Sequence, residues 1–340
     1  MVTIKEVAKK AGVSVATVSR VFNASGPVGA ETAKRVREVA SALRYVPHSG
    51  ARSLITSKTH CIGVVLPDLY GDFFSELIRG MDQRAQQRGF HLLLSSAHNG
   101  KREVEGAMRA MRGRVDALIA MSPHLDEELL IANLPATVPV SLVSSRVQHE
   151  RYDSLVIDNA KGAEEMVAHL VGLGHRRIAI VEGAAGNYDA AERLRGYREA
   201  LRNAGIAGDA SLELPGDFTE ASGFRAAQAL VALADPPTAI FAANDAMAIG
   251  ALSALRELGK RVPEDVAVGG FDDIPLSRYL NPALTSVHVP IAEMGARAAE
   301  LALEALEAGI GNGRVGSRET LPTKLVIRAS TDARSPHTPS

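Results

Sequence analysis

Residues 3–23 read TIKEVAKKAGVSVATVSRVFN. Thr3 and Glu6 have the spacing of a capping box, which predicts a helix that begins at Thr3. Gly12 is typical of a helix end, and Ser14 of the cap of a second helix. Apolar residues recur at helical spacing again from about Glu31, which predicts a third helix to residue 43. Two short helices joined by a tight glycine turn, followed by a third helix, predict a helix-turn-helix module.

The charge of the chain is unevenly distributed. Residues 1–58 contain ten Lys and Arg residues against three Asp and Glu residues, a net charge of +7. The whole chain has a net charge of −1, which leaves −8 for residues 59–340. A basic module on an acidic body indicates a polyanion such as double-stranded DNA as the partner of the module alone. On charge alone, a merely solvated basic face is the alternative.

Length and composition describe an ordinary globular protein with room for two or three domains in 340 residues. The single cysteine, Cys61, cannot form an internal disulfide, which favours a reducing compartment. Lys5, Glu6 and Lys9 interrupt any apolar leader, and no run approaches the roughly 18 apolar residues of a membrane span. We therefore expect a cytoplasmic protein with no membrane partner.

From Cys61 onward, short apolar runs alternate with helical stretches. The expected strands are Cys61–Leu66, Phe90–Ser95, Ala117–Met121, Val138–Val143, Ile178–Val181, Ala239–Ala242 and Val266–Gly270. Continuous apolar strands between helices predict parallel sheets covered on both faces. The length favours two such units that meet near Asp158–Gly162, with a ligand between them at the carboxyl ends of the strands.

Ordered motifs occur along the whole chain. They are Ala11-Gly12-Val13-Ser14 with Thr17-Val18-Ser19-Arg20-Val21 and Asn23, Tyr45-Val46-Pro47, Ala51-Arg52-Ser53-Leu54, Asp72-Phe73-Phe74-Ser75-Glu76, Arg193-Leu194-Arg195-Gly196-Tyr197, Ala243-Asn244-Asp245-Ala246-Met247-Ala248, Gly270-Phe271-Asp272-Asp273 and Pro282-Ala283-Leu284-Thr285. Together they resemble the lactose-repressor family of bacterial transcription regulators. The resemblance implies an N-terminal all-α helix-turn-helix domain and an α/β two-lobed effector domain like the periplasmic binding proteins.

The resemblance also implies domain boundaries. The helix-turn-helix domain would cover residues 1–46, a hinge with a short hinge helix 47–60, the effector-binding and dimerisation domain 61–331, and a tail 332–340. Within the effector domain, one lobe would comprise about 61–159 and 291–319, and the other about 160–290 and 320–331. The tail has two prolines and no heptad pattern, so a tetramer through a C-terminal coiled coil is not expected.

The resemblance places the second helix in the DNA major groove. Val15, Ala16 and Arg20 would then face base edges, and Arg20 can bond guanine O6 and N7 together. The short donors implied to contact phosphates are Ser14, Thr17, Ser19 and Asn23. Residues 49–57, with Ala51, Arg52 and Leu54, would form a hinge helix in the minor groove, where Leu54 would wedge into a base step. One half-site per subunit implies a homodimer on a pseudo-palindromic operator.

The effector site is implied by the same resemblance. Its residues would be Phe73, Phe74, Ser144, Arg193, Phe218, Asn244 and Asp272. Aromatic rings can cover the C–H face of a sugar while polar groups bond its hydroxyls, although a nucleobase would also stack on them. Family members often carry Asp-Arg where this chain has Ser144-Ser145, so an acid that would bind the ligand is absent at that position. Gly29 stands where a serine often caps the third helix, and glycine is an acceptable cap.

Other functions are less well supported. Residues 311–316 match a dinucleotide fingerprint by letter, but they follow a helix rather than a strand, so we interpret them as a surface loop. The histidines lack metal spacing and no nucleophile elbow occurs, so we expect neither an enzyme nor a metal or cofactor site. The main alternatives are a solute-binding protein of the periplasmic sugar-binding type and a nucleoside- or purine-responsive regulator.

Overall fold

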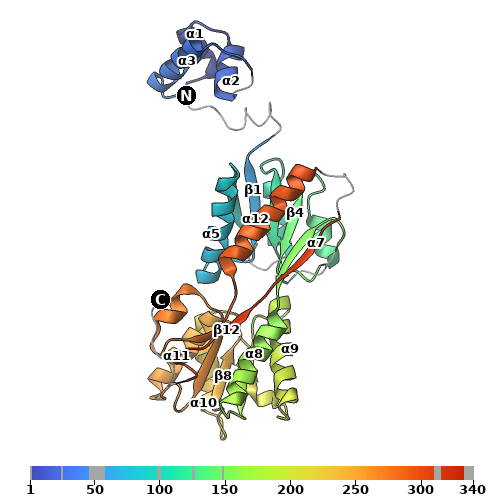
Figure 1. Cartoon of the computed structure of the whole chain (residues 1–340), viewed down its shortest axis with the longest axis vertical. Helices are drawn as coiled ribbons and strands as arrows, with labels where there is room; N and C mark the ends of the chain where they lie inside the picture. Colours follow the sequence, from blue (N-terminus) through green and yellow to red (C-terminus); the bar gives the residue numbers. More distant parts are fainter. Residues whose placement is uncertain are drawn as a thin grey trace. The chain divides into compact units, whose positions relative to one another are not determined.

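The computed structural model describes residues 2–23, 26–45, 58–97, 101–124, 127–147, 149–309 and 315–332. It divides into two compact units, Met1–His60 and Cys61–Ser340 (Figure 1). The expected hinge helix with Ala51, Arg52 and Leu54, and the tail after residue 332, lie outside the described residues.

The first unit contains three helices, α1 (Ile4–Ala11), α2 (Val15–Asn23) and α3 (Ala30–Ala42). The predicted capping box is present, with Thr3 and Glu6 bonding each other's backbone, and α1 ends at Gly12 in the left-handed conformation. The N–H of Thr17 donates to the Ser14 hydroxyl at 3.1 Å, which caps α2. Gly29 is the N-cap of α3 without a side-chain bond. Local sequence therefore sets both ends of α1 and the start of α2.

A small apolar core holds the three helices together. Val7, Val18 and Val36, one from each helix, are fully buried. The Arg35 guanidinium donates from Nε to the carbonyl of Ala11 at 3.1 Å and so ties α3 to the end of α1. With one face of each helix directed inward, the outer face of α2 is left to solvent.

The second unit consists of two lobes, each built on one sheet. The first-lobe sheet has the strand order β11-β5-β4-β3-β1-β2 and is parallel throughout. Its strands are β1 (Cys61–Leu66), β2 (His91–Ser96), β3 (Ala117–Met121), β4 (Val140–Val143), β5 (Asp153–Ile157) and β11 (Arg318–Leu321). The helices of this lobe are α5 (Asp72–Gln87), α6 (Lys101–Met111), α7 (Glu127–Asn133) and α12 (Ile291–Ala308).

The second-lobe sheet has the order β12-β10-β9-β8-β6-β7, and its pairs are parallel except for β10 with β12. Its strands are β6 (Ile178–Val181), β7 (Glu213–Leu214), β8 (Ala239–Ala242), β9 (Ala267–Asp272), β10 (Thr285–His288) and β12 (Lys324–Val326). The helices are α8 (Asn159–Gly172), α9 (Tyr188–Asn203), α10 (Glu220–Val231) and α11 (Asp245–Glu257), with 3₁₀ turns at Ala210–Leu212 and Pro275–Tyr279. The predicted fold class, an all-α module with a two-lobed α/β body, is confirmed.

Apolar periodicity predicts helices that start at Ala163, Ala191, Ser222 and Ala246 in the second lobe, and the structure begins each of them one to four residues earlier. Polar N-caps explain the difference, because their side chains accept backbone N–H groups one turn ahead of the apolar face. These caps are Asp158, Asn187, Thr219 and Asn244. The earlier start matters for α9, because it brings residues 188–190 into the helix and fixes their side-chain directions.

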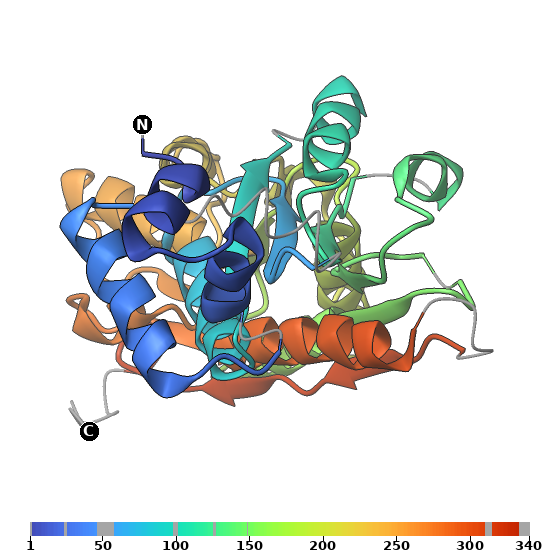
Figure 2. The same ribbon diagram turned by 90° about the horizontal axis from the view of Figure 1, so that it is seen from above.

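Glycines allow three helix pairs to pack closely. A Cβ atom on Gly80 would lie 1.9 Å from the Ala292 carbonyl oxygen, which brings α5 and α12 together, side by side in Figures 1 and 2. A Cβ atom on Gly223 would lie 2.0 Å from the Met247 oxygen, between α10 and α11. A Cβ atom on Gly196 would lie 2.1 Å from the Ala160 oxygen, between α9 and α8. The contact at Gly196 holds α9 closely against α8.

Candidate functional site

The outer face of α2 presents the residues predicted to read bases. Val15 is 41% exposed, and Ala16 and Arg20 are also exposed. An exposed apolar residue next to an exposed arginine on a short helix suits contact with base edges in a groove. The structure therefore places Val15, Ala16 and Arg20 on one accessible face.

The predicted phosphate-contacting residues have local structural roles as well. Ser14 and Thr17 bond each other through their hydroxyls at 2.9 Å, and Asn23 donates from Nδ2 to the Ser19 hydroxyl at 3.1 Å. Ser14 is exposed, and Thr17, Ser19 and Asn23 are partly exposed. Each hydroxyl keeps acceptor or donor capacity beyond its local bond.

Arg193 is the centre of a buried polar network in the second lobe. It lies on α9 and is 4% exposed. Nη1 donates to the carbonyl of Ala243 at 2.5 Å and lies 3.2 Å from Oδ1 of Asp272. The guanidinium carbon lies 3.8 Å from the centre of the Phe271 ring and 6.0 Å from that of Phe218. Arg193, Asp272 and Phe218, three predicted effector residues, are thus brought together.

The same network contains two residues that sequence reasoning missed, Asn159 and Asp189. The amide oxygen of Asn159 accepts from Nε of Arg193, and its Nδ2 donates to Oδ1 of Asp189, both at 2.8 Å. Burial raises the pKa of the Asp189 carboxyl, while Arg193, Ser144 and Asn159 oppose the rise. Asp189 precedes the predicted start of α9, so only its position two residues after a cap-type Asn187 could have indicated it.

Two buried aspartates lie at the end of β9 and the start of α11. Burial raises the pKa of Asp272 to about 6, although Arg193 opposes the rise. Burial and the charge of Asp272 raise the pKa of Asp245 to about 8. The Asp245 carboxylate accepts bonds from Ser277, Ser286 and the Ile274 N–H at 2.6, 2.6 and 2.9 Å, and so holds the segment after β9 in place.

The remaining predicted effector residues have more ordinary surroundings. Asn244 caps α11, because its Oδ1 accepts from the Met247 N–H at 2.9 Å, and its Nδ2 donates to the Phe218 carbonyl at 3.1 Å. These bonds use part of its capacity to hold a ligand. Phe73 and Phe74, at the start of α5, are partly buried against the core with ring centres 5.4 Å apart.

Contacts between the lobes occur beside the Arg193 network. The N–H of Tyr188 donates to the carbonyl of Pro123 at 3.0 Å, and Asn187 Nδ2 lies 3.4 Å from His124 Nε2. Ser144, at the end of β4, lies close enough to the Asp189 carboxyl to lower its pKa. The first turn of α9 therefore meets the carboxyl ends of β3 and β4, so the strand ends of the two lobes face each other across Asp189.

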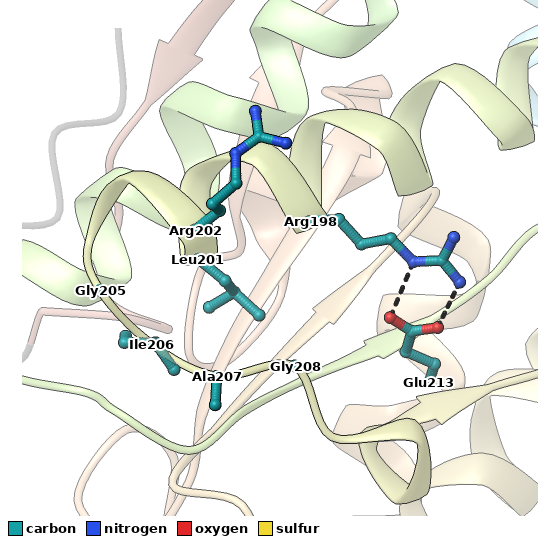
Figure 3. Close-up of a pocket in the computed structure, with 8 residues that line it drawn as sticks. All are labelled: Arg198, Leu201, Arg202, Gly205, Ile206, Ala207, Gly208 and Glu213. Atoms are coloured by element: carbon teal, nitrogen blue, oxygen red, sulfur yellow. Dashed lines mark hydrogen bonds and ion pairs between the residues drawn. The ribbon is translucent and has the colours of Figure 1, made fainter.

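A separate groove of about 420 Å³ lies near the other end of α9 (Figure 3). Arg198 and Glu213 flank it and are joined by bonds of 2.9 and 2.6 Å. Its other lining residues are Leu201, Arg202, Gly205, Ile206, Ala207 and Gly208. Leu201 is 12 residues beyond Asp189, a rise of about 18 Å along a helix, so this groove is distinct from the Arg193 network.

The described ranges of the chain contain no group of three His, Cys, Asp or Glu side chains arranged to hold a metal ion. Nor do they contain a helix long and apolar enough to cross a membrane.

Comparison with known proteins agrees with both halves of this description. Residues 3–48 match the family model for bacterial regulatory proteins of the lacI family, and residues 167–331 match the periplasmic binding protein-like domain. The HTH-type transcriptional regulator DegA of Bacillus subtilis (strain 168) is 34% identical over 97% of this chain and 98% of its own length.

Two solved structures are also similar over 97% of the chain. The lac repressor dimer bound to operator and the anti-inducer ONPF is 31% identical with a TM-score of 0.86, and 99% of that chain is covered. The transcriptional regulator CelR–cellobiose complex is 34% identical with a TM-score of 0.73, and all of that chain is covered. The fold and these similarities define a DNA-binding transcription regulator with a ligand-binding domain. The chain belongs to the lacI family of bacterial regulatory proteins.

Proposed function

We propose that this chain is a transcriptional repressor that binds an operator through α2 and changes its affinity when a small molecule binds around Arg193. The observation that carries the proposal is the exposed face of α2, with Val15, Ala16 and Arg20, on a basic module joined to a body with a buried polar site. DNA binding and ligand binding would thus reside in different units of one chain. Such a regulator acts where the DNA is, which favours the cytoplasm.

Arg20 would supply the main base contact. A guanidinium can bond guanine O6 and N7 together, whereas Val15 and Ala16 can only contact apolar groups such as the thymine methyl. Ser14, Thr17, Ser19 and Asn23 would bind phosphates and so fix the register of the helix. Ala51, Arg52 and Leu54 remain the proposed minor-groove residues of the hinge, on the family resemblance alone.

We propose a homodimer as the operator-binding form. The similar lac repressor is described as a dimer on its operator. In this chain β2 is an edge strand of the first-lobe sheet, and its Leu93 and Leu94 are 36% and 38% exposed. Exposed leucines on an open sheet edge favour coverage by a second copy of the chain. A two-fold dimer would require a pseudo-palindromic operator.

A sugar or sugar derivative is the proposed effector. Arg193, Asp272, Asn159 and Asp189 provide charged and amide groups that can bond hydroxyls, and Phe218 lies beside them. The similar CelR structure contains cellobiose, which favours a carbohydrate. A nucleoside or purine is the alternative, because a nucleobase can also stack on Phe73 or Phe218. An enzyme is not proposed.

A gel-shift assay tests the DNA-binding half of the proposal. The probe is the DNA upstream of the gene, searched for a palindrome, and the control is random DNA of equal length. We expect tighter binding to the palindrome and an affinity that falls steeply with salt, because Lys and Arg displace counterions. A solute-binding protein of the periplasmic type would bind sugar but neither of the two DNA probes. Equal affinity for the two probes would exclude a sequence-specific repressor.

A further inference from the structure

Asp189 is buried more deeply than its position in the chain requires. It lies in the first turn of α9, where a carboxylate is favoured by the helix dipole even when exposed. Asp189 is nevertheless only 6% exposed, and burial of a carboxylate costs free energy unless polar groups surround it. Asn159 donates one hydrogen bond at 2.8 Å, and nearby Ser144 favours the charged form of the carboxyl by lowering its pKa. The fold thus maintains an acid where the strand ends of the two lobes meet.

Asp189 lies near Ser144, the position where family members often carry an aspartate and this chain has a serine. Ser144 follows β4, and a serine there cannot accept a ligand hydroxyl as strongly as a carboxylate does. Ser144 lies in the opposite lobe from Asp189 and lowers the pKa of its carboxyl. The acid of the site therefore comes from α9 of the second lobe, and the first lobe contributes hydroxyls.

A second observation concerns Ser122, whose buried hydroxyl is available for a hydrogen bond to a ligand. Ser122 follows β3, whose last residue Met121 pairs with Val143, so Ser122 and Ser144 end neighbouring strands. Ser122 is 6% exposed, and among the described residues its hydroxyl has no hydrogen-bond partner. Ser141 and Ser154 also have partnerless hydroxyls, but they lie inside β4 and β5, whereas Ser122 lies at a strand end where its hydroxyl can bind a ligand group.

The charges around the site are unbalanced. In the network of described residues around Arg193, that arginine is the one buried cation. It contacts Asp272 directly and is linked to a second acid, Asp189, through Asn159. Ionised, the three groups sum to one negative charge. Arg146, two residues beyond Ser144, is exposed and lies over the Tyr188 ring, so water and salt screen its charge. An anionic ligand would meet repulsion that a neutral polyol would not.

We propose that Asp189 is a specificity-determining residue that accepts bonds from ligand hydroxyls, and that the site selects uncharged polyhydroxylated ligands over their phosphorylated counterparts. This inference rests on the proposed function, because it concerns the effector site of the same regulator. Asn159 positions Asp189 and Arg193 relative to each other, and Ser144 and Ser122 complete the wall from the first lobe.

Calorimetric titration of the full chain tests the inference with matched probes. The pairs are D-ribose and ribose 5-phosphate, D-glucose and glucose 6-phosphate, and adenosine and adenosine 5′-monophosphate, with cellobiose as a further neutral sugar. The variants are Asp189→Asn, which keeps the shape but removes the charge, and Glu199→Gln as the control. Glu199 lies on the same helix and pairs with exposed Arg195, so its substitution makes the same charge change outside the site.

The expected result is that at least one neutral probe binds and its phosphorylated partner binds at least about tenfold more weakly. Asp189→Asn should weaken the neutral probe by about 10- to 100-fold, the range for a hydrogen bond to a charged group, and should narrow the gap to the phosphorylated probe. Glu199→Gln should change neither. Melting temperatures of both variants, followed by circular dichroism, verify that they fold.

Three results would overturn the inference. One is a phosphorylated probe that binds as well as its neutral partner, and another is an Asp189→Asn variant with unchanged affinity; either leaves the proposed regulator standing. The third is the failure of every neutral probe to bind the wild type, because the named ligand class would then be wrong. The gel shift with operator and random DNA decides the DNA-binding function independently.

Discussion

Arg193 and Asp272 form an ion pair in which Nη1 lies 3.2 Å from Oδ1 and each side chain is 5% exposed. Nη1 also donates to Ala243, and Asn159 accepts from Nε. A pair this deeply buried costs desolvation, and its geometry repays that cost only while both partners remain. The pair therefore links α9 to the end of β9 and gives a ligand a preformed polar wall.

Removal of Arg193 should affect the effector response and the stability of the body, but not the DNA-reading face. Arg193→Ala leaves Asp272 buried without its partner, so we expect a loss of about 3–5 kcal/mol in the free energy of unfolding. The variant should still bind operator at temperatures where it is folded, and the effector should no longer change that affinity, because its differential contact is lost. Urea unfolding and gel shifts with and without effector measure the two effects. A variant that keeps the full wild-type response would show that Arg193 does not hold the effector.

Replacement of Arg20 should reduce discrimination between DNA sequences. We expect Arg20→Ala to weaken operator binding by about 1–3 kcal/mol and random-DNA binding much less, because a bidentate base contact is lost. Arg20→Lys is the matched variant, since it keeps the charge without the planar fork. The measurement is the ratio of the two affinities at one salt concentration. If both affinities fell equally, Arg20 would be a phosphate contact only.

Close helix packing at Gly196 gives a prediction about stability. Gly196→Ala places a Cβ 2.1 Å from the Ala160 carbonyl oxygen, so α8 and α9 must separate. We expect a loss of about 1–3 kcal/mol. Gly106→Ala in α6 is the control, because a Cβ there meets nothing within 4 Å, and alanine should stabilise the helix by about 0.5–1 kcal/mol. In thermal unfolding, Gly196→Ala should lower the melting temperature and Gly106→Ala should raise it. An unchanged melting temperature for Gly196→Ala would contradict the close packing of α8 and α9.

The sequence was a good guide where one local rule acts alone. The capping box of Thr3 and Glu6, the turn at Gly12, and strands such as Ala117–Met121 agree with the structure because spacing and apolar runs determine them. The strand pair of β10 with β12 and the order of the sheets depend on long-range contacts, which no local pattern encodes.

The effector site shows the same division. Arg193 and Asp272 could be named from motifs, and the structure pairs them. Asp189 and Asn159 could not, because their significance arises only when α8 and α9 pack together and bring the two side chains within 2.8 Å. Asn244 was predicted as a ligand-binding residue, and its role as a helix cap became visible only once α11 was seen to begin at Asp245. The site assignments as a whole remain predictions.

The buried carboxyl of Asp245 should make the stability of the body depend on pH. Burial and the nearby charge of Asp272 raise its pKa from an ordinary 3.8 to about 8, although Ser277, Ser286 and the Ile274 N–H favour the charged form. Between these two values the unfolded chain has lost the proton while the folded chain retains it. The folded state therefore binds more protons, and the free energy of unfolding should fall as pH rises from 5 to 7.

Asp245→Asn should remove this contribution and make the slope of stability against pH less negative by up to about 1.4 kcal/mol per pH unit, the value for one proton. Asp265→Asn is the control, because bonds from Arg261 lower the pKa of that exposed carboxyl to about 2, so it does not titrate in this range. Urea unfolding at pH 5, 6 and 7 gives the slopes for the three proteins. We expect the wild type and Asp265→Asn to have equal slopes. If Asp245→Asn shared that slope, Asp245 would be ionised in the folded protein, and its three hydrogen bonds would outweigh its burial.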